Sequence, residues 1–390
     1  MKILGIVAEY DPFHNGHLYH IAKAKKQAAP DLTYIVLSPC VKQRGGLALL
    51  SPADRARCAL EAGADAVFSL PVCWTLRDAE HYALGAVSLL SRLGATHLAF
   101  GAETADADLL RRAANLLENP PARFDEVLKE TLAGGAGWPA AVSAAVSDVF
   151  PEARGLLDKP NNILAICYLR AVRRLKLSLE PVVIRRAGSY HAATVTRSAP
   201  SASALREALL RGSYAEALAA VPSCTADIIR RRFLEGRVPD ERSLDTLLLS
   251  RLRCMTEEAY RSLPDLSEGM ENALQAAARS AATRRGLIDS LTGKRYPAAR
   301  ISRLCACALL GLTADEISGA PLPENGLLLG LRKNREMTAR WKDLPVPVIP
   351  SFTEWKKAVH PADLAAWRLW AQCSRLPDTL PFSEPIVIAE

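Results

Sequence analysis

Residues 3–17 read ILGIVAEYDPFHNGH, a short apolar run followed at once by a turn of polar and small residues. The run 3–8 has the length and composition of a buried strand. The turn carries His14, Gly16 and His17, and His20 follows three residues later. Gly16 lets the backbone approach a ligand closely. A helix that begins here lies at a strand's carboxyl end, where phosphate binds in parallel sheets. We therefore predict an α/β fold with a phosphate site at its first turn.

The first 200 residues continue this alternation of apolar runs and amphipathic stretches. Further apolar runs occur at 34–38, 66–70, 97–100 and 181–184, and amphipathic stretches at 18–28, 53–62 and 79–93. This order is typical of a parallel sheet with helices on both faces. The long interval 105–177 predicts several helices inserted before the fifth strand.

Beyond Ser203 the sequence carries almost no strand signal. Helical periodicity occurs at 206–218, 245–262, 269–291 and 302–312. We therefore expect two domains. The first, residues 1–200, is a Rossmann-like, parallel-sheet nucleotide-binding domain with a helical insertion at about 105–177. The second, residues 201–390, is mainly α-helical.

Composition excludes several classes of protein. The chain has 390 residues, of which 49% are hydrophobic and 23% charged; this suits two or three folded domains and argues against disorder or a fibrous repeat. No apolar run approaches the roughly 20 residues that cross a bilayer, so we expect no membrane partner. The nine cysteines lack paired spacing, which favours reduced thiols in a cytoplasmic protein. The net charge of +7 permits a nucleic-acid partner without requiring one.

The histidines of the first turn suit phosphate chemistry. His14 and His17 are three residues apart, so both project from one side of a helical turn. Protonated or hydrogen-bonded imidazoles can hold phosphate oxygens as charge develops in phosphoryl or nucleotidyl transfer. The alternatives are a capped helix with incidental histidines, or a zinc site, for which no cysteine or carboxylate has matching spacing. No Walker loop competes, because Gly293-Lys294 lacks the earlier glycine and is followed by Arg295.

A second motif, Ser201-Ala202-Ser203-Ala204-Leu205-Arg206, opens a predicted helix. Ser201 or Ser203 can cap this helix, which places Arg206 in its first turns. Together the two motifs resemble the nucleotidylyltransferase superfamily, whose signatures are a His-x-Gly-His turn and a late Ser-Ser-Thr-x-Ile-Arg segment. The resemblance implies that His14, His17 and Arg206 are catalytic and contact the ATP phosphates, with Ser201 and Ser203 beside them. A capped surface helix that carries an arginine is the alternative for the second motif.

The whole of residues 7–20 looks like the opening of the bacterial tRNA(Met) cytidine acetate ligases. Further matching segments are Gln43-Arg44-Gly45, residues 79–83 (AEHYA), 100–103 (FGAE), 160–164 (PNNIL), 186–191 (RAGSYH), 268–272 (EGMEN), and Lys294-Arg295-Tyr296 with Arg300 and Arg303. They cover nearly the whole chain in order. The resemblance implies an ATP-dependent, AMP-forming ligase that activates acetate and acetylates N4 of the wobble cytidine of elongator tRNA(Met).

The chain departs from this family in one loop. The family usually has Ser-Gly-Asn-Phe before Gln-Arg-Gly, whereas this chain has SPCVK at residues 38–42, and Gly46 replaces the usual acid. The loop follows the second strand, at the carboxyl edge of the expected sheet. The changes bear on the contacts to acetate or cytidine and leave the ATP motifs intact.

The resemblance also implies a set of ATP-binding residues. These are Val7, Ala8, Glu9, Tyr10, Asp11, Pro12, Phe13, His14, Asn15, Gly16, His17, Leu18, Tyr19, His20, Gly101, Asn162 and Arg186, with the neighbours Asn161 and Arg185. Asn162 offers an amide for a base or ribose, and Arg186 can fork onto phosphate. The alternatives are a turn glycine at 101, an asparagine that caps the following helix, and a surface arginine.

A basic cluster in the second half suits RNA phosphates. Its members are Arg284, Arg285, Lys294, Arg295, Arg300 and Arg303, with Tyr296 available for stacking on a base. A solvated helix face is the alternative. Mg²⁺ is expected on the ATP phosphates, with no visible protein ligands. Two other functions remain open: a small-molecule adenylyltransferase, for which the helical half is superfluous, and a non-enzymatic RNA-binding protein on the same fold.

Overall fold

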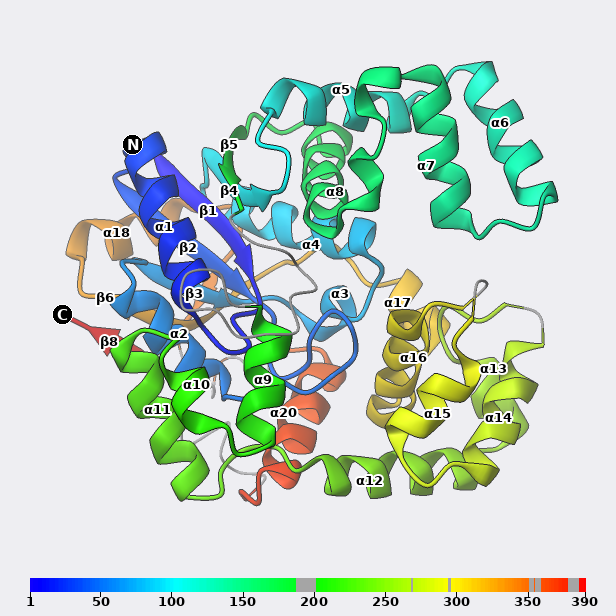
Figure 1. Cartoon of the computed structure of the whole chain (residues 1–390). Helices are drawn as coiled ribbons and strands as arrows, with labels where there is room; N and C mark the ends of the chain where they lie inside the picture. The colour runs from blue at the N-terminus through cyan, green and yellow to red at the C-terminus, as the bar shows by residue number, and fades with distance from the viewer. Residues whose placement is uncertain (187–200, 268, 294–295, 351–353, 355–358, 378–385) are drawn as a thin grey trace.

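The computed structural model describes residues 1–186, 201–267, 269–293, 296–350, 354, 359–377 and 386–390. Its centre is one twisted sheet in the order β5-β4-β1-β2-β3-β6-β7, with β8 paired to β6 (Figure 1). The strands are β1 (Ile3–Ala8), β2 (Leu32–Leu37), β3 (Ala66–Ser69), β4 (His97–Ala102), β5 (Glu180–Arg185), β6 (Gly326–Arg332), β7 (Val348–Ile349) and β8 (Val387–Ala389). The first five strands are parallel, as the sequence predicts.

Alternating side chains of the strands enter two separate cores, which is why the strands read as continuous apolar runs. Leu4, Ile6 and Ala8 of β1 belong to one core, and Ile3 belongs to the other. Helices α1 (Asn15–Ala28), α2 (Pro52–Glu61), α9 (Ala202–Leu210), α11 (Ser223–Leu234) and α20 (Pro361–Cys373) cover the first face. Helices α4 (Ala79–Arg92), α5 (Ala107–Glu118) and α8 (Pro160–Arg174) cover the second.

The expected insertion between the fourth and fifth strands is confirmed. Helices α6 (Ala122–Ala133) and α7 (Trp138–Val149) pair with each other between α5 and α8. They stand away from the sheet at one end of the molecule (Figure 1). α8 packs back on α4 and β4, so the chain re-enters the sheet at β5.

The second half forms a separate group of helices. It contains α12 (Glu241–Cys254), α13 (Glu257–Arg261), α14 (Met270–Ser280), α15 (Arg284–Leu291) and α16 (Ala298–Leu310). These helices bury a hydrophobic core of their own, with Leu248, Leu274, Leu287 and Ile301 at its centre. Shorter helices complete this half and the edges of the sheet: α3 (Val72–Thr75), α10 (Tyr214–Leu218), α17 (Ala314–Ser318) and α18 (Arg335–Arg340).

The expectation of almost no strand beyond Ser203 is wrong. β6, β7 and β8 return to the same sheet, and β6 runs antiparallel to β3. α20 also returns, since Trp367 and Trp370 are buried in the first core and Trp370 Nε1 donates to the Ala48 carbonyl at 2.7 Å. A domain boundary at residue 200 stays a prediction, but residues beyond it complete the sheet. Within the described ranges, no helix is long and apolar enough to cross a membrane.

Candidate active site

The turn between β1 and α1 fixes both histidines through a reciprocal cap. His14 is the N-cap of α1, and its Nδ1 accepts from the Gly16 amide at 3.1 Å. His17 Nδ1 accepts from the His14 amide at 3.3 Å. A Cβ at Gly16 would lie 2.9 Å from His14 Cε1, so only glycine allows this ring position. The two rings stack with their centroids 3.7 Å apart.

This geometry assigns the proton of each imidazole. Because Nδ1 accepts a hydrogen bond in both rings, Nε2 carries the hydrogen. Burial, with the nearby charge of Arg186 adding to it, lowers the pKa of His14 to about 3. Burial and the neighbouring His14 also lower the pKa of His17 well below its usual value. The sequence allowed either protonated or neutral, hydrogen-bonded imidazoles. The structure favours the neutral form, in which each ring can donate through Nε2.

The backbone amides at the start of α1 are already used. The Asn15 amide donates to the Ala220 carbonyl at 3.1 Å, and the His17 amide to the His14 carbonyl at 2.8 Å. The Gly16 amide is held by His14. The helix terminus therefore offers a phosphate few free backbone donors, and the phosphate contact that the sequence suggests for this turn stays a prediction. Leu18 and Tyr19, also expected at the ATP site, are exposed.

Gly101, His20 and Arg186 lie together at the ends of β4 and β5. A Cβ at Gly101 would lie 3.0 Å from Arg186 Cγ and 3.9 Å from His20 Cδ2, so the glycine makes room for both side chains. Burial and the charge of Arg186 lower the pKa of His20 to about 4. The structure thus brings together three residues that the sequence places far apart, because adjacent parallel strands end at one edge.

Two buried polar atoms in this region lack a hydrogen-bond partner among the described residues. They are the Tyr10 hydroxyl and His20 Nε2. The Tyr10 ring packs edge-on against Phe13 and lies 4.8 Å from the His17 ring, between centroids. An unpaired buried polar atom costs free energy, which a bound polar ligand recovers. Both atoms are therefore candidates for ligand contacts.

Asp11 is the centre of an ion network beneath the histidine turn. Its Oδ2 lies 2.7 Å from Lys42 Nζ and 3.1 Å from Arg206 Nη1, and its Oδ1 accepts from the Leu49 amide. Burial raises the pKa of Asp11, but the two cations outweigh burial and hold it below the usual value. Arg206 also pairs with Glu241 of α12 at 2.9 Å.

The second motif is confirmed as a capped helix start, because Ser201 Oγ accepts from the Ala204 amide at 3.1 Å. Ser203 is exposed on α9. Arg206 was expected on the ATP phosphates, but the structure places its guanidinium on Asp11, Glu241 and the Leu47 carbonyl. Its direct contact with phosphate stays a prediction.

Sequence reasoning missed Arg55, which is fully buried in α2. Its guanidinium donates to the carbonyls of Glu9 at 2.8 Å and Ser38 at 2.9 Å, and also to Pro39 and Leu50. One side chain thereby joins the loops that follow β1 and β2. The sequence offers no signal for it, since an arginine in an amphipathic helix normally faces solvent.

Glu9 also joins these two loops. Its Oε1 accepts from the Gln43 amide at 2.6 Å. Burial raises the pKa of this carboxyl, and Lys42 opposes the rise. Gln43 Nε2 in turn donates to the Arg77 carbonyl at 2.7 Å, so the loop after β2 is held from both sides.

The asparagines at the start of α8 make hydrogen bonds to other residues of the chain. Asn162 is fully buried; its Oδ1 accepts from the Thr104 amide, and its Nδ2 donates to Thr104 Oγ1 and the Leu156 carbonyl. Glu103 accepts from the Asn162 amide at 2.9 Å and from Asn161 Nδ2 at 2.6 Å. We expected the Asn162 side chain to donate to a base or ribose, but its amide nitrogen already donates to Thr104 and Leu156. Arg185 is exposed at the end of β5.

The basic cluster divides in the structure. Arg285 is exposed, with 91% of its side chain accessible, and its Nε lies 3.7 Å from Asp289 Oδ2 on the same helix. Arg300 and Arg303 both bind Asp265, and Arg300 lies over the Tyr296 ring. Lys294 and Arg295 lie outside the described residues.

Arg284 joins the helical group to the loop after β2. Its Nη2 donates to Ser302 Oγ at 2.6 Å and to the Gly45 carbonyl at 3.3 Å. Gly45 has a φ of +79°, and a Cβ there would lie 2.3 Å from the Ser302 carbonyl oxygen. The loop 42–46 therefore rests directly on α16, while Lys42 binds Asp11. Arg284 is thus a contact between the two halves of the chain, and its contact with RNA stays a prediction.

Comparison with known proteins agrees with this fold. A family model described as HIGH Nucleotidyl Transferase matches residues 1–376. A tRNA(Met) cytidine acetate ligase of Acetivibrio thermocellus is 32% identical over 97% of this chain and 96% of its own length. One of Syntrophomonas wolfei is 36% identical over 81% of this chain and 78% of its own.

Solved structures are also similar. Apo Thermotoga maritima TmcAL superposes with a TM-score of 0.93 at 27% identity, covering 100% of this chain and 99% of that one. The same protein bound with alpha-thio ATP gives a TM-score of 0.90 over the same shares. The histidine turn and the parallel sheet thus define a nucleotidyl transferase of the HIGH class. Within this class, the chain belongs to the family of tRNA(Met) cytidine acetate ligases.

Proposed function

We propose that this protein uses ATP to activate acetate and acetylates N4 of the wobble cytidine of elongator tRNA(Met). The observation that carries the proposal is the pair of neutral imidazoles at the end of β1, with Nε2 of each free to donate, beside Arg186. The family supports the substrates, because its members are named for tRNA(Met), cytidine and acetate. ATP is supported by the structural relative bound with an ATP analogue.

In the first step, an acetate oxygen attacks the α-phosphorus of ATP. The bond from phosphorus to the pyrophosphate oxygen breaks, which yields acetyl-adenylate and pyrophosphate. Negative charge grows on the phosphate oxygens, and donors that are fixed in advance stabilise it. His14 and His17 supply two such donors, and Arg186 supplies a positive charge. Neutral imidazoles cost less to bury than charged ones, so the donors exist before ATP binds.

In the second step, the N4 amine of cytidine attacks the acyl carbon of acetyl-adenylate. The bond from that carbon to the phosphate oxygen breaks, AMP leaves, and N4 loses one proton. No covalent enzyme intermediate is needed. The contribution of the protein is to place the two reactants and to stabilise charge. The ion network on Asp11 and the carbonyl contacts of Arg55 hold the loops that surround the turn.

Mg²⁺ is expected to accompany the ATP phosphates. Among the described residues, no group of three or more His, Cys, Asp or Glu side chains could hold a metal. Asp11, the acid nearest the turn, already binds Lys42 and Arg206. The phosphates themselves would thus supply most of the ligands for Mg²⁺.

We place the enzyme in the cytoplasm, where tRNA is modified and where its free cysteines stay reduced.

The test is incubation of the full chain with ATP, radiolabelled acetate and total tRNA, followed by nucleoside analysis. We expect N4-acetylcytidine in elongator tRNA(Met) and release of AMP. If no nucleoside carries the acetate label and ATP instead reacts with a small metabolite, the result would favour the alternative of a small-molecule adenylyltransferase. tRNA binding with no turnover of ATP would favour the non-enzymatic alternative.

A further inference from the structure

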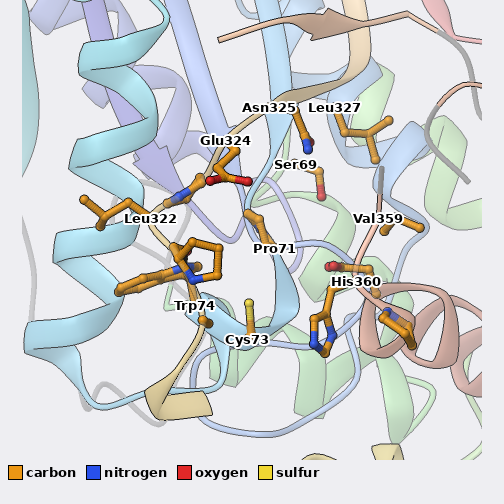
Figure 2. A pocket seen from close by; sticks show the side chains of 15 residues that line it. Ser69, Pro71, Cys73, Trp74, Leu322, Glu324, Asn325, Leu327, Val359 and His360 are labelled. Carbon is orange, nitrogen blue, oxygen red and sulfur yellow. Dashed lines mark hydrogen bonds between the residues drawn. The ribbon is translucent and has the colours of Figure 1, made fainter. Parts of the chain in front are cut away.

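A cavity of about 360 Å³ opens at the carboxyl end of β3. Its walls come from Ser69 at the strand end, Cys73 and Trp74 of α3, the loop 320–325 before β6, and the start of α20 (Figure 2). β3 is two strands from β1, so the cavity opens at the same edge of the sheet as the histidine turn. The volume lies in the range of pockets that hold small organic groups.

One carboxyl oxygen in this cavity has no hydrogen-bond partner among the described residues. Asp363 lines the cavity and is 94% buried, since its exposed fraction is 6%. Its Oδ1 accepts from the Val72 amide at 2.7 Å. Oδ2 accepts no hydrogen bond from the part of the chain that the structure describes. This oxygen is thus available to accept a hydrogen bond from a ligand in the cavity.

The other lining groups narrow the choice of ligand. Glu324 is the second acid of the wall, and no lysine or arginine is among the lining residues within the described ranges. Acetate and phosphate are therefore disfavoured here. His360 Nδ1 accepts from the Ala362 amide at 3.2 Å, so its Nε2 carries a hydrogen that can be donated. The remaining wall consists mostly of proline and aliphatic side chains together with the Trp74 ring, and it suits a flat ring.

We propose that this cavity receives the cytosine ring of the tRNA, with Asp363 Oδ2 accepting a hydrogen bond from N4. The inference rests on the proposed function, which requires an unstacked cytidine to reach the protein. Carboxylates recognise cytosine through its N4 amine, and enzymes that modify a base take it out of the stack into a pocket. His360 Nε2 would donate to N3, which is an acceptor in cytosine and a donor in uracil.

Burial raises the pKa of Asp363 to about 7, and the Val72 amide opposes the rise. At neutral pH the carboxyl is therefore partly ionised, and the bound amine favours the ionised form. Such a carboxylate is also suited to take the proton that N4 loses when it is acetylated. Trp74 and Arg92 hold the loop 320–325 in place by donating to the carbonyls of Pro321 and Pro323.

The test measures how the full protein binds two anticodon stem-loops that differ only in cytidine or uridine at the wobble position. The wild type is expected to bind the cytidine form roughly tenfold more tightly. Asp363→Asn keeps an oxygen for the Val72 amide but presents NH₂ to the ligand, which matches O4 of uracil. Its preference should therefore fall and shift toward the uridine form. Asp108→Asn, the same change at an exposed position of α5 outside the cavity, should leave the preference unchanged.

His360→Asn keeps a capping side chain for α20 but loses the Nε2 donor, so it should reduce the preference even if Asp363→Asn fails to fold. Equal binding of the two loops by the wild type, or an unchanged preference in both variants, would overturn the assignment of the cavity. A wild type that prefers the cytidine loop yet makes no N4-acetylcytidine would instead count against the proposed function alone.

Discussion

At the scale of single residues, the site depends on side chains whose protonation is set by their surroundings. His14 and His17 are held as neutral donors because each Nδ1 caps the helix and burial disfavours the charge. Asp11 stays ionised because two cations reach it. The same buried region therefore contains a stable anion and stable neutral imidazoles, each fixed by its own contacts.

Removal of either imidazole should abolish most of the first step. We expect His14→Ala or His17→Ala to slow acetate-dependent pyrophosphate exchange by two to three powers of ten, about 3–4 kcal/mol of transition-state stabilisation. His97→Gln is the matched control, because His97 lies at the opposite end of β4. Near wild-type exchange in both alanine variants would refute the role of the turn.

His20 should make folding sensitive to acid. Its folded pKa is about 4 and its unfolded value is about 6.5. Between these values only the unfolded chain binds the proton, so stability falls as pH falls from 6.5 toward 4. The free energy of unfolding, measured with urea, should fall between pH 7 and pH 5 in the wild type. In His20→Gln this fall should be smaller by about 1–2 kcal/mol. His81, whose pKa is raised by Asp78, should give the opposite change when it is replaced by glutamine.

At the scale of elements, the loop 42–46 connects the two halves of the protein. It binds Asp11 through Lys42 and rests on α16 through Gly45. Arg284 closes the contact from α15. The position of the histidine turn therefore depends on helices that lie more than 200 residues further along the chain.

Gly45→Ala should break this contact, because its Cβ would overlap the backbone of Ser302 and its φ is positive. We expect a loss of about 1–3 kcal/mol in the free energy of unfolding and slower tRNA acetylation. Gly46→Ala is the matched control, since its Cβ would meet only the ends of two flexible side chains, Lys42 and Arg284, and its φ lies outside the left-handed region. Equal urea midpoints and equal rates for the two variants would show that the loop does not depend on α16.

At the scale of the whole molecule, the helical half gives the enzyme a surface beyond the nucleotide site. The group α12–α16 has its own core, and α6 and α7 of the insertion stand away from the sheet (Figure 1). A free nucleoside would use neither feature. A folded RNA can contact such distant surfaces and orient its reactive amine through them.

Substitution of Arg285 on α15 can show whether the surface of the helical group binds RNA. We expect Arg285→Ala to weaken tRNA binding and to lower the log–log salt slope by about one unit, because each phosphate contact releases counterions. Arg111→Ala, an exposed arginine of α5, is the control. An unchanged slope in Arg285→Ala would return this position to an ordinary solvated face.

Substrate size should matter for turnover as well as affinity. We expect efficient acetylation of tRNA(Met), weaker acetylation of an anticodon stem-loop, and very little of free cytidine, because remote contacts contribute to the orientation of the amine. Comparison of kcat and KM for the three substrates checks this. Comparable turnover of cytidine and tRNA would leave the helical half without a role.

By itself, the sequence determined the parallel sheet, the helical insertion and the histidine turn. These follow from local periodicity and from a motif whose residues are adjacent in the chain, so no knowledge of distant contacts was needed. The sequence did not predict β6, β7 and β8. β6 is rich in leucine and glycine rather than β-branched residues, and the other two strands have only two or three residues.

Tertiary structure alone decided which partner each polar side chain finds. Arg206 binds Asp11 and Arg284 binds the loop of Gly45, although the sequence suggested phosphate and RNA for them; Arg55, which the sequence did not single out, is buried among carbonyls. The cavity at Asp363 joins segments about 290 residues apart, since Asp363 accepts from the Val72 amide. Such pairings depend on how elements pack across the sheet, and sequence periodicity reports only which face of an element is buried.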